Sequence, residues 1–136
     1  MTIYLGNFFL LLSLFFSITQ FFFLQKKNKF KFISLVISGL LISSFLSFIL
    51  LIYAHIISDF SLLNVYQNSH TTKPLFYKIS GVWGNHEGSL LLWILVLTIF
   101  NYFIFKLYNN NNSIFVSKTL QVQGVITAGF IIFTIF

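Results

Sequence analysis

Long apolar runs separated by polar stretches dominate the pattern of this sequence. Four runs are about 20 residues long, which is enough for a helix to cross a hydrocarbon core of ~30 Å. They cover residues 4–24, 33–57, 89–107 and 119–136. The last run has about the minimum spanning length and stops on apolar Phe136, as expected of a fragment of a longer protein. The pattern predicts an all-α integral membrane protein with a single membrane domain and four transmembrane helices.

The polar connections between these runs differ in length and in charge. Lysine clusters in the first connection, 25–31, and on both flanks of the third, 108–118. The long second connection, 58–88, holds only Lys73 and Lys78. Because positive residues gather on the matrix or cytoplasmic side, we expect the loop 58–88 and both termini to face the intermembrane space or periplasm.

Composition supports a membrane protein and excludes several other classes. The chain is 57% hydrophobic and 7% charged, against about 25% charged residues in soluble domains. The net charge of +6 therefore sets orientation and does not indicate a nucleic-acid partner. Without cysteine there is no disulfide, thiolate metal site or covalent haem attachment motif. Abundant Phe, Asn and Lys, and a start without a presequence, favour synthesis inside an organelle and a mitochondrial inner-membrane location.

Small residues recur every four positions within two of the apolar runs. Such spacing lets helices approach closely, because lipid provides no hydrophobic force between helices. The helix face formed by these small residues could dock a partner, but packing within this chain is the favoured interpretation. Asn101, inside the third run, should hydrogen-bond to a neighbouring helix. The small residues are Gly39, Ser43 and Ser47 in the second run and Gly124 and Ala128 in the fourth.

The loop 58–88 is too long and too aromatic to be a plain connection. Ser58 or Asp59 could cap a short helix over residues 60–67. Pro74 signals a second short helix, whose apolar residues share one face, as in a helix lying in the membrane interface. These apolar residues are Leu75, Phe76, Ile79, Val82 and Trp83.

The stretch "GVWGNHEGSLLLW", residues 81–93, concentrates scarce ionisable groups. Asn85 can cap the third span, and Glu87 in its first turn is favoured by the unsatisfied N–H groups of the helix. These roles require no catalysis, so we treat the stretch as an interaction surface. The candidate residues are Trp83, Gly84, Asn85, His86, Glu87 and Gly88.

Of the catalytic and metal-binding motifs considered, only ligation of haem by a histidine stays open. His86-Glu87 is not the zinc motif H-E-x-x-H, because position 90 is Leu. Two acids and three histidines form no convincing Ser-His-acid set, and no catalytic, cofactor-binding or metal-binding residue is assigned. Haem iron commonly takes histidine ligands, so ligation by His55, His70 or His86 stays open, although an interfacial or hydrogen-bonded histidine is the commoner role.

The loop carries a family resemblance. Its blocks "SDFSL", "NSH", "KPL", "YKI" and "WGNHEGS" match, in order and spacing, the first large external loop of the CcmF family. Residues 122–136, "VQGVITAGFIIFTIF", resemble the next helix of that family. Members are membrane subunits of cytochrome c haem lyase, and the resemblance implies haem attachment to apocytochrome c at the outer membrane face. The family's Trp-rich loop has no counterpart here, so the resemblance transfers no haem ligand.

The resemblance implies an N-terminal membrane subunit of a split haem lyase, non-catalytic by itself. Haem would belong to the assembled lyase, and this chain alone would hold none. Its partners would be membrane lipid and the remaining lyase chain or chains, which carry the Trp-rich loop. The alternative is a structural transmembrane subunit of a respiratory-chain complex derived from the same family, with that complex's subunits as partners. An ion-conducting subunit is disfavoured, because no Asp, Glu, Lys or Arg lies mid-span.

Overall fold

Four long helices form the body of the molecule. The computed structural model describes residues 2–23, 30–108 and 114–135. Each long helix has the length and apolar composition to cross a membrane, and all regular structure in the described ranges is helical. The fold class predicted from the hydrophobic pattern is therefore confirmed. The long helices are α1 (Thr2–Phe23), α2 (Phe30–Ile56), α5 (His86–Tyr108) and α6 (Ile114–Ile135).

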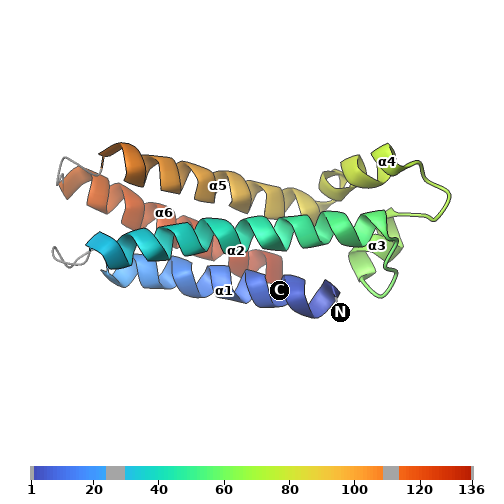
Figure 1. The fold of residues 1–136 in the computed structure, drawn as a ribbon, viewed down its shortest axis with the longest axis horizontal. Helices are drawn as coiled ribbons and strands as arrows, with labels where there is room; N and C mark the ends of the chain where they lie inside the picture. Colours follow the sequence, from blue (N-terminus) through green and yellow to red (C-terminus); the bar gives the residue numbers. More distant parts are fainter. Residues whose placement is uncertain (1, 24–29, 109–113, 136) are drawn as a thin grey trace.

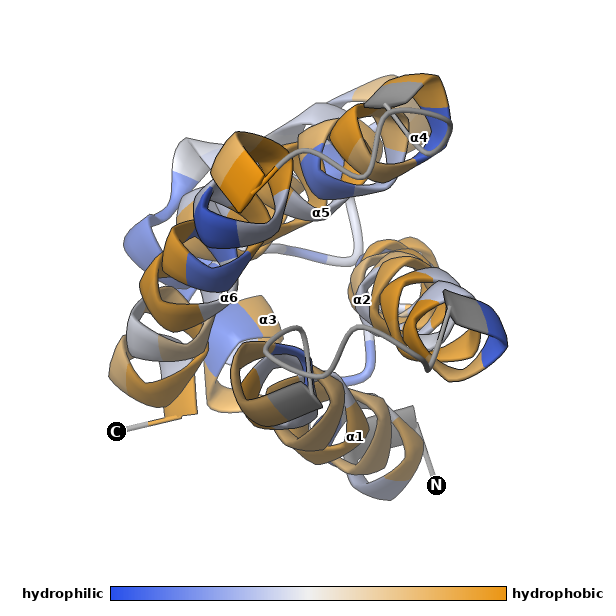
Figure 2. Ribbon diagram, turned by 90° about the vertical axis from the view of Figure 1, so that its left-hand side faces the viewer, coloured by the Kyte–Doolittle hydropathy of each residue, from blue (hydrophilic) through white to orange (hydrophobic). Residues whose placement is uncertain are grey.

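The long helices form an up-and-down bundle. Helix α1 packs against α2 and α6, and α5 packs against the same two helices, so the four form a ring (Figure 2). The start of α1 and the end of α6 lie at the same end of the bundle as the segment between α2 and α5 (Figure 1). We call this the loop end. The other end carries the start of α2, the end of α5 and the start of α6 (Figure 1).

An apolar cluster lies inside the bundle, and the outward faces of the helices are apolar as well. The core joins residues from every long helix, including Leu10, Phe48, Ile94 and Ile131. Large side chains also remain exposed along the outside, as expected for helices that face lipid. Examples are Phe15, Phe22, Leu35, Phe100 and Phe133.

The helices extend beyond the apolar runs from which they were predicted. Helices α2 and α5 begin three residues before the runs 33–57 and 89–107, and α6 begins five residues before position 119. Backbone hydrogen bonds define a helix, so its ends continue into polar flanks that a hydropathy pattern excludes. With 22 residues, α6 exceeds the minimum spanning length expected for it. The residues 24 and 136 of the predicted spans lie outside the described residues.

The small residues of α2 and α6 face helix α1. A Cβ on Gly39 would lie 2.7 Å from the Phe16 ring, and one on Gly124 would lie 3.2 Å from the Ser17 carbonyl oxygen. Both glycines therefore allow α1 to approach. The remaining small residues are buried or half-buried: Ser43, Ser47 and Ala128.

Buried polar side chains pair across the helices. Gln20 and Asn101 exchange two amide hydrogen bonds, of 3.0 and 2.7 Å, and Gln20 also donates to the Leu120 carbonyl at 2.6 Å. The hydroxyls of Ser44 and Thr98 lie 2.9 Å apart and join α2 to α5. The expectation that Asn101 bonds to a neighbouring helix is confirmed, and these pairs satisfy groups that lipid cannot.

Candidate functional site

The segment between α2 and α5 folds over the loop end as two short helices and one 3-10 turn. The first helix, α3 (Leu63–Asn68), begins three residues later than the predicted helix 60–67. Its N-cap is Leu62, so the predicted cap by Ser58 or Asp59 is wrong. The Asp59 carboxylate instead accepts hydrogen bonds from the backbone N–H and the hydroxyl of Ser61, which forms a local turn that competes with capping.

The second helix, α4 (Leu75–Ser80), starts directly after Pro74 and passes into the 3-10 helix η1 (Gly81–Gly84). The predicted common apolar face is divided. Val82 is fully buried, whereas Phe76 is 77% exposed. A 3-10 helix has 3.0 residues per turn instead of 3.6, so residues beyond Gly81 leave the face defined by α4. The exposed apolar side of α4 agrees with a membrane-interface position, which stays a prediction.

Asn85 connects η1 to α5 and caps the long helix. Its side-chain oxygen accepts the Gly88 N–H at 2.7 Å, and its backbone carbonyl accepts the Ser89 N–H at 3.1 Å. The predicted cap is therefore confirmed. Asn64 of α3 exchanges two 3.1 Å amide hydrogen bonds with Asn85 and donates to the Glu87 carboxylate at 2.6 Å. One side chain of α3 thus holds both the cap and the first-turn acid of α5.

Gly88 is required for space at this junction. A Cβ on Gly88 would lie 1.7 Å from the Val82 carbonyl oxygen, inside any possible contact distance. No described glycine has a positive φ, so backbone conformation does not explain the residue. Gly81 and Gly84 have no neighbouring atom within 4 Å of an added Cβ. Only Gly88 among these three glycines lets the η1 backbone rest against α5.

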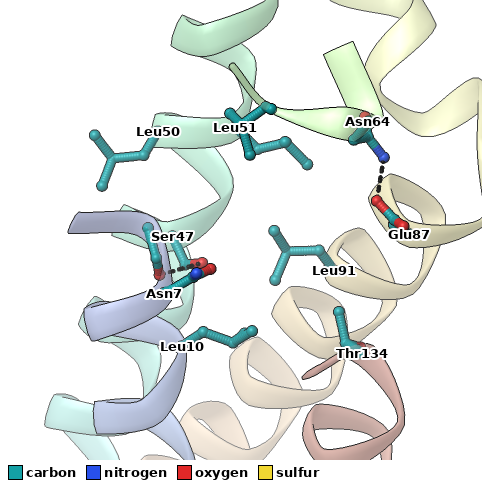
Figure 3. Close-up of a pocket in the computed structure, with 11 residues that line it drawn as sticks. Asn7, Leu10, Ser47, Leu50, Leu51, Asn64, Glu87, Leu91 and Thr134 are labelled. Carbon is teal, nitrogen blue, oxygen red and sulfur yellow. Dashed lines mark hydrogen bonds between the residues drawn. The ribbon is translucent and has the colours of Figure 1, made fainter. Parts of the chain in front are cut away.

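A cavity of about 130 Å³ lies directly under this junction (Figure 3). Its walls come from the loop-end turns of α1, α2, α5 and α6 and from the start of α3. Five leucines and Gly6 form the apolar part. The polar side chains that line it are Asn7, Ser47, Asn64, Glu87 and Thr134.

The remaining candidates of the stretch 83–88 point elsewhere. Trp83 is 43% exposed, and its backbone carbonyl accepts a hydrogen bond from the Ser89 hydroxyl. Gly84 is exposed. The His86 ring packs edge-on against Phe133 of α6, with ring centroids 5.8 Å apart. The structure therefore separates an exposed side of this stretch from the cavity side, which holds Glu87.

The three histidines belong to three different segments: His55 to α2, His70 to the α3–α4 connection and His86 to α5. His55 is fully buried; its Nδ1 donates to the Leu51 carbonyl at 3.0 Å, and its Nε2 has no partner among the described residues. His70 and His86 are exposed on separate elements. No histidine lines the cavity, which is also far smaller than the about 300–1,000 Å³ of ordinary cofactor and drug pockets. We therefore derive no step through haem.

Asn64 is the residue of this site that the sequence did not reveal. A lone asparagine in a short loop helix carries no motif, and its importance depends on a contact 21 and 23 residues away along the chain. The cavity could not be predicted from the sequence either, because five separate elements form its walls.

Comparison with known proteins identifies relatives of this chain. No family model matches the chain. It is 48% identical over 87 residues to the cytochrome c-type biogenesis protein CycK of Bradyrhizobium diazoefficiens, and 39% identical over 98 residues to CcmF of Haemophilus influenzae. The chain is a homologue of the CcmF/CycK cytochrome c-type biogenesis proteins. These matches cover 64% and 72% of this chain but only 13% and 15% of the relatives.

A solved structure of the cytochrome c haem lyase CcmF shares the fold of this CcmF/CycK homologue. The two agree with a TM-score of 0.83 and 25% sequence identity, over 96% of this chain and 23% of the lyase. The family resemblance seen in residues 58–93 is thus confirmed. The chain corresponds to a small part of the proteins it resembles.

Proposed function

We propose that this chain is the N-terminal membrane subunit of a split cytochrome c haem lyase. In this role it supports covalent attachment of haem to apocytochrome c and is non-catalytic by itself. The observation that carries the proposal is the match to the lyase CcmF, which extends over nearly the whole chain but over 23% of the lyase. The remaining lyase parts, including the Trp-rich loop, would come from one or more separate chains.

The arrangement of the loop end suits a supporting role. Asn64, Asn85 and Gly88 fix the segment between α2 and α5 against the bundle. This leaves the other side of the segment, with Trp83 and His86, exposed. In the proposed assembly that exposed surface contacts the chain that carries the Trp-rich loop.

We further propose a mitochondrial inner-membrane location with the loop end towards the intermembrane space. The support for this orientation is the lysine distribution, and the support for the mitochondrial location is the composition of the chain. Lys31, Lys106 and Lys118 lie near the bundle end opposite the loop end (Figure 1), which the positive-inside rule assigns to the matrix. The other lysines of the first connection, 26, 27 and 29, lie outside the described residues.

A single-cysteine labelling experiment tests this orientation, because the chain has no native cysteine. Asn68→Cys in α3 should react with a membrane-impermeant maleimide added from the intermembrane-space side. Lys118→Cys, the matched control at the other end, should react only after the inner membrane is opened. The reverse pattern would contradict the orientation.

The function is tested by purifying the tagged chain from gently solubilised membranes. We expect a second chain with the Trp-rich loop to co-purify, and depletion of this chain to leave apocytochrome c without covalent haem. The competing function is a structural subunit of a respiratory complex. Co-purification with such a complex in fixed stoichiometry, with normal haem attachment to cytochrome c, would refute the lyase role.

A further inference from the structure

The rim of the cavity under the α3–α5 junction carries a negative charge without a counter-ion. Glu87 accepts one hydrogen bond, from the neutral amide of Asn64. It forms no ion pair with any residue in the ranges that the structure describes. The chain as a whole is basic, with a net charge of +6, so an unpaired carboxylate at a cavity is unusual here. Such a group favours a cation.

A second polar group at the cavity is also unpartnered. The side-chain amide of Asn7 lies on the opposite wall from Glu87 (Figure 3). It forms no hydrogen bond with the described residues. The hydroxyls of Ser47 and Thr134, by contrast, already donate to the carbonyls of Gly6 and Phe130. Asn7 therefore offers a free donor to an incoming acceptor.

The cavity becomes apolar with depth. Leu10 and Leu91 lie about one helical turn further from the loop end than Asn7 and Glu87, and both line the cavity. Its volume of about 130 Å³ approaches the ~150 Å³ of an apolar cavity that takes up benzene. The interior can therefore hold about six carbon atoms, by comparison with that cavity.

We propose that this cavity binds an aminophospholipid with a primary ammonium headgroup. The ammonium lies on the Glu87 carboxylate, and the phosphate accepts a hydrogen bond from the Asn7 amide. The first methylenes of one acyl chain enter the space between Leu10 and Leu91, while the remainder of the lipid lies along the exposed outer faces of the bundle. The ammonium, the phosphate and the acyl chain of the lipid thus follow the change from polar to apolar residues along the cavity wall.

A lipid fits better than a basic side chain of another protein. Both exposed polar groups, Asn7 and Glu87, are at the rim, and the leucines are below them. A lysine that reaches Glu87 from the aqueous side leaves the Asn7 amide and the leucine-lined interior unfilled, whereas a bilayer lipid brings an ammonium, an acceptor and an apolar chain to all three. Among lipids, an anionic headgroup is repelled by Glu87, and a choline headgroup has no N–H to donate.

The proposal is tested by reconstituting the full chain into nanodiscs. The discs contain equal amounts of phosphatidylethanolamine, phosphatidylcholine and phosphatidylglycerol, and lipid retained after detergent extraction is measured by mass spectrometry. We expect the retained lipid to be enriched in phosphatidylethanolamine. Glu87→Gln, which keeps the shape and the hydrogen bond from Asn64, should reduce the enrichment about three- to tenfold, the range of one charge-assisted hydrogen bond.

Two further variants make the result specific. Asp59→Asn removes the only other acidic residue, which does not line the cavity, and should leave the enrichment unchanged. Leu91→Phe should fill the cavity and abolish retention while Glu87 stays in place; if that variant does not fold, the Glu87 and Asp59 pair decides. Equal retention of the three lipids, or equal enrichment in the Glu87→Gln variant, would overturn the proposal. So would cross-linking of Glu87 to a lysine of a co-purified chain.

Discussion

Replacing Gly88 by alanine probes the junction where η1 rests on the first turn of α5. The added Cβ would lie 1.7 Å from the Val82 carbonyl oxygen and 2.8 Å from the Val82 carbonyl carbon. Real Cβ atoms essentially never come within 3.0 Å of another atom, so the Val82 backbone must retreat by at least 1.3 Å. That movement pulls on Asn85, whose side chain caps Gly88.

The size of the effect follows from three terms. Forced overpacking with a backbone shift costs about 1–3 kcal/mol. Loss of the Asn85 cap adds about 1 kcal/mol. Alanine's higher helix propensity returns about 1 kcal/mol. Gly88→Ala should therefore lower the free energy of unfolding by about 1–3 kcal/mol.

The assay is reversible denaturation in mixed micelles, followed by tryptophan fluorescence. Both tryptophans, Trp83 and Trp93, flank the junction, so the signal reports on it directly. Gly84→Ala is the matched control: its Cβ meets nothing within 4 Å, and the change should be neutral or stabilising by up to about 1 kcal/mol. If the two variants had equal stability, the close approach at Gly88 would be refuted.

Two predictions concern the bundle. Gln20→Leu should destabilise the protein because Asn101 loses its buried partner, and a double-mutant cycle with Asn101→Leu should give a coupling of about 0.6–1.7 kcal/mol, as for other membrane helix pairs. Zero coupling would contradict the pairing. Gly39→Ala brings a Cβ to 2.7 Å from the Phe16 ring; repacking costs about 1–3 kcal/mol and alanine's helix propensity returns about 1 kcal/mol, so the net loss in the same unfolding assay should be about 0–2 kcal/mol. Gly129→Ala, at an open position of α6, should be neutral or stabilising by up to about 1 kcal/mol; equal effects of the two changes would argue against a tight α1–α2 contact at Gly39.

The bundle could be predicted because lipid imposes a simple rule on sequence. A span must be apolar over about 20 residues, and a polar residue such as Asn101 must find a partner inside the protein. The identity of that partner was not predictable. Gln20 lies near the end of α1, where a polar residue is ordinary at the flank of a membrane span. Helix α6 packs against both α1 and α5, and this packing brings the amides of Gln20 and Asn101 together.

The loop was harder to predict because local and tertiary effects compete there. The Asn85 cap was visible, since capping is decided within one turn of helix. The separation of Leu75 from Val82 could not be predicted, because the helix changes type between them. The role of Gly88 was also hidden: a glycine near a helix start suggests a turn, whereas this one makes room for a backbone carbonyl.

The Gln20–Asn101 pair has a consequence for how the four long helices assemble. Helices α1 and α2 precede α5 and α6 along the chain. Neither supplies the partners of Gln20, which are 81 and 100 residues further along the chain, in α5 and α6. An α1–α2 hairpin alone therefore leaves the Gln20 amide without these partners, and the pairing forms only once α5 and α6 pack against it. Among the four long helices, the Gln20 contacts therefore tie the earliest segment of the described chain to its latest.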